Sequence, residues 1–166
     1  MVRMLLVLLL LTPSVAFTFE YEPAGFRSIS WDSPAGTIAG LRSTGVAEGT
    51  IRHYMKSDET FIHEGVTLTD IRYLADQDKI VGADLTYDCS QRATLAETLK
   101  KNYGVPTRTA RGGTFTWQGK MTTITLVPPD AINPVRPLPA GEPALCLLTF
   151  RSTAFIWKNV PTPKVK

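Results

Sequence analysis

Cys89 and Cys146 carry the most reactive side chains of the sequence, which contains no other cysteine. A reactive thiol is typically found in a Cys-x-x-Cys pair or beside a histidine, and neither cysteine has such a neighbour in the sequence. In an oxidising compartment, two cysteines in separate strands are more simply explained by a disulfide. We therefore predict a Cys89–Cys146 disulfide, with a reactive thiol as the alternative.

A basic segment lies between residues 100 and 120. It contains no acidic residue and five basic ones: Lys100, Lys101, Arg108, Arg111 and Lys120. The backbone amides of Gly112 and Gly113 could approach an anion closely. We interpret the segment as a candidate surface for an anionic ligand or partner, such as a phosphorylated lipid headgroup, an acidic glycan or an envelope protein. The alternative is a solvated helix end whose lysines complement the helix dipole.

The remaining polar candidates predict no metal site. His53 and His63 are the only histidines, and with Glu64 they would form an incomplete ligand set even if their strands paired. A closed zinc site needs four ligands, so we interpret both as ordinary strand histidines. The sequence Asp76-Gln77-Asp78 is similar to the start of a calcium loop but lacks the glycine and glutamate of such loops, so we expect a tight turn.

No catalytic residue and no cofactor is predicted. The chain has no Gly-x-Ser-x-Gly elbow, phosphate-binding loop or zinc-protease helix. Trp31, Phe115 and Trp117 could line a ligand cage, but large aromatic side chains are highly buried on average, so we expect them in the core. An enzyme would have to assemble its site from scattered side chains.

The first residues have the pattern of a secretory leader. Arg3 is followed by an unbroken apolar run from Leu5 to Leu11 and then by Ser14-Val15-Ala16, whose small residues suit a cleavage site. We expect residues 1–16 to be a signal peptide and the protein to be periplasmic or secreted, with an uncleaved amphipathic anchor as the alternative. Because the apolar run is far shorter than the roughly 20 residues that cross a bilayer, no stable membrane span is expected.

Composition excludes several classes of protein. With 43% hydrophobic and 20% charged residues, the chain is not collagen-like, coiled-coil or wholly disordered. Removal of Arg3 with the leader lowers the formal net charge from +3 by one unit. Such a nearly neutral protein does not suit nucleic acid, which is bound by dense basic stripes.

Hydrophobic periodicity predicts a sheet-rich fold. A first strand is expected at Phe26–Trp31, followed by a short helix near residues 33–41 that Asp32-Ser33-Pro34 would start. From residue 51 on, apolar and polar residues alternate as in an antiparallel meander. The expected strands of this meander are 51–56, 60–64, 70–75 and 80–87.

One main helix is expected at Gln91–Tyr103. Ser90 would cap the helix, and Gly104 would stop it. Its apolar stripe repeats every four residues: Leu95, Leu99 and Tyr103. This stripe is expected to pack on the sheet.

Further strands and a long loop follow the helix. Phe115–Trp117 and Met121–Val127 are expected to form a hairpin, and Ala144–Phe150 a last strand. Between them, residues 128–143 are rich in proline and are interpreted as a semi-rigid surface excursion. The tail, residues 158–166, is expected to be disordered.

The predicted fold class is α+β. An antiparallel sheet of about six to eight strands would carry the 91–103 helix on one face, within a single domain at residues 17–157. The alternative is a pair of tandem halves, each with a helix followed by strands.

The sequence resembles a loose group of small exported bacterial proteins of unknown function. The resemblance covers roughly residues 25 to 126 and is carried by four short stretches: Gly25-Phe26-Arg27-x-Ile29-x-Trp31, Leu99 through Tyr103-Gly104-Val105-Pro106, Phe115-Thr116-Trp117, and Thr123-Ile124-Thr125-Leu126. These stretches mark where strands, turns and helices begin or end, and they carry no catalytic signature. The resemblance implies an α+β periplasmic domain without a known activity.

These observations favour a non-enzymatic binding or envelope-associated module. One alternative is an enzyme, such as a hydrolase that uses scattered carboxylates or Cys89. Another is an accessory subunit of an envelope assembly, which would use an exposed strand edge as a template for a partner strand.

Overall fold

The protein is described by a computed structural model at residues 19, 21–110, 112–129 and 143–159. The predicted signal peptide, most of the proline-rich excursion and residues 160–166 lie outside these ranges. The described residues form a nine-stranded antiparallel sheet, a separate two-stranded hairpin and one long helix. The predicted class, an antiparallel sheet with one main helix, is therefore confirmed, although the sheet has more strands than expected.

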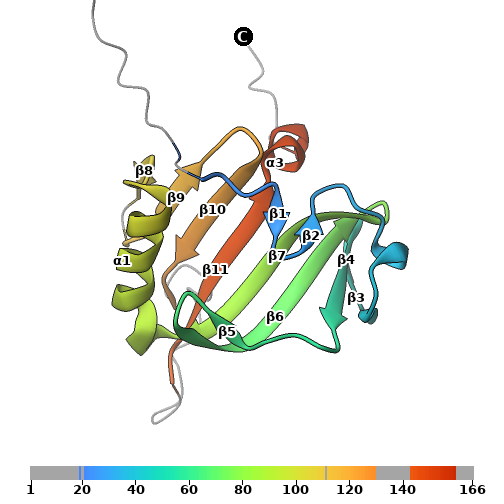
Figure 1. Cartoon of the computed structure of the whole chain (residues 1–166), viewed down its shortest axis with the longest axis horizontal. Coiled ribbons are helices and arrows are strands. Elements are labelled where there is room, and N and C mark those ends of the chain that lie inside the picture. Colours follow the sequence, from blue (N-terminus) through green and yellow to red (C-terminus); the bar gives the residue numbers. More distant parts are fainter. Residues whose placement is uncertain (1–18, 20, 111, 130–142, 160–166) are drawn as a thin grey trace, which may run out of the picture.

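The main sheet does not follow the order of the sequence. Its strands are β3 (Leu41–Glu48), β4 (Ile51–Lys56), β5 (Ile62–His63), β6 (Val66–Asp76), β7 (Lys79–Asp88), β8 (Arg108–Thr109), β9 (Phe115–Gln118), β10 (Thr122–Val127) and β11 (Leu145–Ser152). In space they run β3-β4-β6-β7-β11-β10-β9-β8, while β5 pairs with the first residues of β6. The last strand therefore lies in the middle, between β7 and β10 (Figure 1). Because the nine strands form a single continuous sheet, the alternative fold of two tandem halves is wrong.

The first part of the chain differs from the expectation. Instead of one strand at Phe26–Trp31, β1 (Gly25–Phe26) and β2 (Ile29–Ser30) form a tight hairpin, because Arg27 adopts a positive φ of 54°. The predicted helix near residues 33–41 is wrong. Only a single 3-10 turn, η1 (Ala35–Thr37), forms there, and the edge strand β3 follows it.

Helix α1 (Arg92–Tyr103) confirms the predicted main helix. A 3-10 turn, η2 (Cys89–Gln91), precedes it and is capped by the side chain of Asp88, which accepts a hydrogen bond from the amide of Ser90. The predicted cap by Ser90 is wrong, because the N-cap residue of α1 is Gln91, whose side chain makes no cap hydrogen bond. Gly104 ends the helix with a φ of 81°, a conformation that favours glycine. The buried side of α1 consists of Leu95, Ala96 and Leu99.

A second helix, α3 (Thr153–Asn159), directly follows β11. The expectation that the tail beyond residue 157 is disordered is therefore wrong for Lys158 and Asn159, which belong to this helix. Thr153 fixes the start of α3, since its amide donates to the carbonyl of Met121 and its hydroxyl donates to the carbonyl of Gly119.

The core lies on one face of the sheet, under α1 and the β1–β2 hairpin (Figure 1). Its largest fully buried side chains include Trp117, Tyr73, Tyr87, Phe26 and Phe150. The indole of Trp117 donates to the carbonyl of Gly104, which ties the end of α1 to β9. Trp31 and Phe115 are partly buried and pack against the same core, so the three aromatic side chains serve packing, as predicted.

Cys89 and Cys146 are joined in the predicted disulfide, with Cα atoms 5.0 Å apart. The bond links the end of β7 to the start of β11, where the amide of Cys89 also donates to the carbonyl of Ala144. The two thiols are therefore not available as nucleophiles.

The opposite face of the sheet is more polar. Arg151 on β11 extends across β7 to form an ion pair of 2.6 Å with Asp84, and it donates to the carbonyl of Ala83. Gly82 makes this possible, because a Cβ atom there would lie 2.7 Å from Cδ of Arg151. A row of threonines, Thr149, Thr125 and Thr116, continues this face toward β9.

Candidate functional site

A pocket of about 220 Å³ lies at the end of the sheet where β6 turns into β7. We call it the α3 pocket. Its wall consists of side chains from the β6–β7 hairpin, from the segment after β2 and from α3: Asp32, Asp76, Gln77, Lys79, Val81, Ala154, Phe155 and Lys158. Because this volume is below the 300–1,000 Å³ typical of drug-sized ligands, the pocket suits a smaller molecule.

The β6–β7 turn positions one side of the α3 pocket. Asp76 and Lys79 are the last pair of the ladder, and Gln77 and Asp78 between them have φ values of 49° and 65°. Two positive φ values at the centre of a two-residue hairpin are typical of a type I′ turn. The predicted turn at Asp76-Gln77-Asp78 is therefore confirmed, although Asp76 belongs to the strand and is buried.

The segment after β2 is bound to the same turn. The amide of Asp32 donates to the carbonyl of Ile80 at 2.8 Å, and the amide of Ala35 donates to the carbonyl of Asp78 at 2.8 Å. Asp32 itself has a φ of 63°. These contacts hold Asp32 at the pocket wall beside the β6–β7 turn.

Helix α3 supplies the third side of the pocket. Its first turn is bound to the β9–β10 turn through Thr153, and its last turn reaches Asp76 through Lys158. The ammonium of Lys158 lies 3.4 Å from Oδ2 of Asp76, which is longer than the 2.7–2.9 Å of a strong charge-assisted hydrogen bond. Ala154 and Phe155 add apolar surface between these two contacts.

Asp76 is the unusual residue of this site. Its side chain is 10% exposed, and its Oδ1 atom is buried without a hydrogen-bond partner among the described residues. Buried carboxylates are normally paired, because removing an unpartnered charge from water costs several kcal/mol. The α3 pocket thus contains a carboxylate whose charge is only partly compensated.

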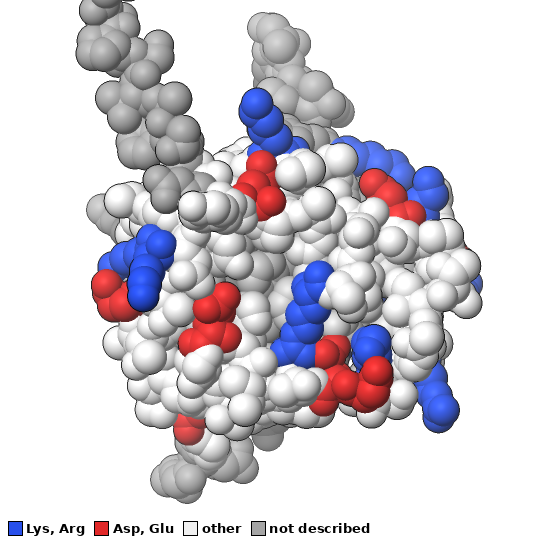
Figure 2. All heavy atoms as spheres, viewed as in Figure 1, with Lys and Arg blue, Asp and Glu red and all other residues white. Residues whose placement is uncertain are grey.

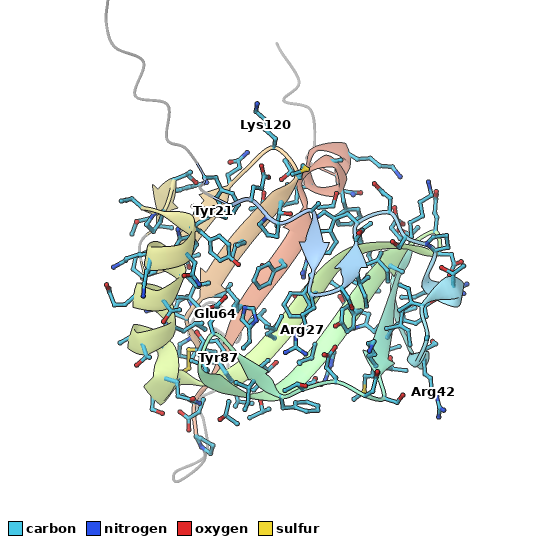
Figure 3. All side chains as sticks on the ribbon, in the orientation of Figure 1. Tyr21, Arg27, Arg42, Glu64, Tyr87 and Lys120 are labelled. Carbon is cyan, nitrogen blue, oxygen red and sulfur yellow. A yellow bond between two sulfur atoms is a disulfide. The ribbon has the colours of Figure 1, made fainter. Side chains whose placement is uncertain are left out.

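A second polar cluster, which we call the Arg27 cluster, holds the β1–β2 hairpin on the sheet. Glu59, whose side chain is 8% exposed, accepts from the guanidinium of Arg27 and from the hydroxyl of Tyr73. Arg27 also donates to the carbonyls of Thr60 and Ile62, at 2.6 and 2.9 Å. Figure 3 shows Arg27 extending from the hairpin over the sheet. Burial and, second, the hydrogen bond to Glu59 raise the pKa of Tyr73, so its hydroxyl stays protonated and donates.

The two histidines lie on opposite faces of the sheet. His63 contacts the core residues Phe26 and Phe150, whereas His53 pairs with Leu74, the neighbour of core-facing Tyr73 on β6. Successive residues of a strand point to opposite faces, so His53 and Leu74 face away from the core. Within the described ranges, no three His, Cys, Asp or Glu side chains are grouped to hold a metal ion.

The candidate basic surface is spread over several elements. Lys100 and Lys101 lie in the last turn of α1, Arg108 lies on β8, and Lys120 lies on the β9–β10 turn. Lys100 is paired with Glu97 at 2.7 Å and lies over the ring of Phe115. Figure 3 shows Lys120 at an edge of the molecule, away from α1, and in Figure 2 the basic side chains on the same face are scattered. Arg111 lies outside the described residues, and anion binding by this segment stays a prediction.

The free edges of the sheet disfavour an added strand. The edge strand β3 is interrupted by an irregularity between Ser43 and Ala47, where the amides of Gly45 and Val46 point to the hydroxyls of Ser43 and Thr44. Bulges of this kind twist an edge away from partners. At the other edge, β8 has only two residues.

Sequence reasoning missed the α3 pocket. Asp76 was assigned to a turn, and Lys158 to a disordered tail. The apolar run Ala154–Trp157 after Thr153 was the available signal for a helix at this position.

No family model, curated protein or solved structure matches this chain. None of the described helices is long and apolar enough to cross a membrane. The function must therefore be argued from the geometry of the chain itself.

Proposed function

We propose that this protein is an exported binding module that holds a small polar ligand in the α3 pocket. The observation that carries the proposal is Asp76, a buried aspartate at the pocket wall, one of whose carboxylate oxygens has no partner in the described part of the chain. Two aspartates and two lysines line the cavity together with apolar side chains, which is the combination that orients a small ligand.

Export is supported by the disulfide and by the leader-like start of the sequence. A disulfide persists in an oxidising compartment such as the periplasm or the extracellular space. A binding role is favoured over hydrolysis by a thiol or a histidine pair, because both cysteines are oxidised and the two histidines are separated by the sheet. These features leave the pocket carboxylates and lysines as recognition groups.

The proposal is tested by nuclear magnetic resonance of the purified protein. Backbone amides of Lys79, Val81 and Ala154 are followed while small amines, amino acids, carboxylates and phosphate esters are added. We expect saturable shifts of these amides with at least one class of compound. An absence of saturable shifts with all four classes would overturn the proposal.

A pocket-filling variant provides the specificity control. Ala154→Trp places an indole in the α3 pocket and should abolish the shifts. Ala93→Trp places the same side chain on the exposed side of α1, outside the pocket, and should leave binding unchanged. Equal binding by the two variants would remove the α3 pocket as the site.

A further inference from the structure

The charged side chains around the α3 pocket differ in solvent exposure. This difference indicates the sign of the charge that a ligand would carry into the pocket. The carboxylate of Asp76 is 10% exposed, whereas the side chain of Lys158 is 63% exposed and Lys79 is exposed. Interactions with a solvated ammonium contribute little, because water and salt screen them. Pairing the buried carboxylate with a ligand of opposite charge would therefore contribute more to binding than pairing either exposed ammonium group.

The existing partner of Asp76 is a poor substitute for a bound ion. Lys158 reaches only Oδ2, at 3.4 Å, and Oδ1 is buried with no partner among the residues that the structure describes. An ammonium group has three donors and could contact Asp76 and Asp32 together, since both residues line the pocket. An anionic group entering the same pocket would meet only the solvated ammonium groups of Lys79 and Lys158 and would be repelled by the buried carboxylate of Asp76.

The rest of the wall suits an alkyl or aromatic group on the ligand. Val81 lies at the wall from β7, and Ala154 and Phe155 face the same space from α3. The ring of Phe155 can also attract a cation through its π face. A short chain with one charged end matches this arrangement.

We infer that the α3 pocket recognises a small organic ammonium compound, and that Lys158 occupies Asp76 as a tethered competitor until the ligand displaces it. This inference rests on the proposed function and specifies its ligand class. Displacement exchanges one ammonium for another at Asp76, so the net charge at the carboxylate is preserved. The ammonium of Lys158, already mostly solvated, then loses only a weak contact.

Three probes of equal chain length test the inference: n-butylammonium, n-butanol and butyrate. Binding to the wild-type protein is measured by nuclear magnetic resonance titration of the pocket amides at low and high salt. We expect saturable binding of butylammonium alone. Asp76→Asn should weaken it about tenfold or more, because a charge-assisted hydrogen bond to a buried carboxylate is lost.

The competitor role gives a second, opposite expectation. Lys158→Met should strengthen butylammonium binding by up to about fivefold, the equivalent of one exposed ion pair. Lys79→Met removes the same charge from the same pocket wall and is the matched control. We expect a smaller gain with Lys79→Met, which disappears at high salt. Equal gains from both variants at high salt would overturn the role of Lys158.

The outcomes separate this inference from the proposed function. Preferential binding of butyrate that Ala154→Trp abolishes would overturn the ammonium class and keep the pocket as a binding site. If none of the three probes binds while another class of the larger panel does, the ammonium class alone is overturned. If Asp76→Asn does not fold, Asp32→Asn replaces it, and unchanged binding by Asp32→Asn would contradict the shared contact to both carboxylates.

Discussion

The imidazole of His63 is perpendicular to the ring of Phe150, with ring centroids 5.5 Å apart. The ring of Phe26 lies 5.4 Å from that of His63 and 5.0 Å from that of Phe150, so the three rings form one cluster. Burial among these rings and, second, the charge of Arg27 lower the pKa of His63 to about 4. The histidine is therefore neutral in the folded protein at every pH above this value.

The first prediction is a loss of stability in acid that depends on His63. Because the unfolded histidine titrates near 6.5 and the folded one near 4, the unfolded state alone binds the proton as the pH falls between these values. This titration should lower the free energy of unfolding by roughly 3 kcal/mol between pH 7 and pH 4. Urea unfolding of the wild type and of His63→Phe, measured across this range, isolates the effect as their difference. A constant difference would contradict the neutral, buried state.

The second prediction concerns the Arg27 cluster. Glu59→Gln removes the charge that Arg27 and Tyr73 share and should lower the free energy of unfolding by about 1–3 kcal/mol. Tyr73→Phe should cost less, since Arg27 still satisfies Glu59, and the effects of the two changes should not add. Urea unfolding of both single variants and the double variant measures the coupling. Asp58→Asn, one residue away, is the control; it weakens only an exposed ion pair with Lys56 and should cost far less than Glu59→Gln.

The third prediction concerns the disulfide. The bond spans a sequence separation of 57 residues, for which the chain-entropy model gives about 4 kcal/mol of stabilisation. The double variant Cys89→Ala/Cys146→Ala should approach this loss in urea unfolding, and the reduced wild type controls for the missing sulfur atoms. The intact mass of the oxidised protein should be two hydrogens lower than that of the reduced protein. Two alkylatable thiols in protein purified from its native compartment would rule the bond out.

The fourth prediction concerns the packing of α1. Leu99 is fully buried between the helix and the sheet, and Leu99→Ala should destabilise the protein by about 2–5 kcal/mol. Thr94→Ala, on the exposed side of the same helix, should stay within about 0.5 kcal/mol of the wild type. Thermal and urea unfolding measure both. Equal stability of the two variants would show that α1 does not pack as described.

Local patterns predicted those elements that bury one face. Residues 51–56 form β4 as expected, and α1 begins one residue after the predicted start, because alternation and four-residue spacing both report a buried side. Strand β3 was missed because seven of its eight residues are exposed, so it carries no alternation. The β1–β2 hairpin was missed because its turn depends on a positive φ at Arg27, which no glycine marks.

The candidate site depends on contacts that no local pattern encodes. Asp76 and Lys158 are 82 residues apart, and Arg27 and Glu59 are 32 residues apart. Each pair forms only because the sheet brings distant segments to the same end or face. The disulfide, with a sequence separation of 57 residues, is also a long-range contact, and it could be predicted only because the chain has two cysteines and therefore one possible internal pairing.

The central position of β11 sets the order in which the chain can fold. A chain that emerges N-terminus first, from a ribosome or through a membrane channel, can pair β3, β4, β6 and β7 early, but β7 and β10 remain separated until β11 inserts between them. Until that step, both inner edges of the sheet are open to pairing with other chains. Truncation before Leu145 should therefore leave the two halves of the sheet unjoined, and oxidation of Cys89 with Cys146 should trap the inserted strand once it has arrived.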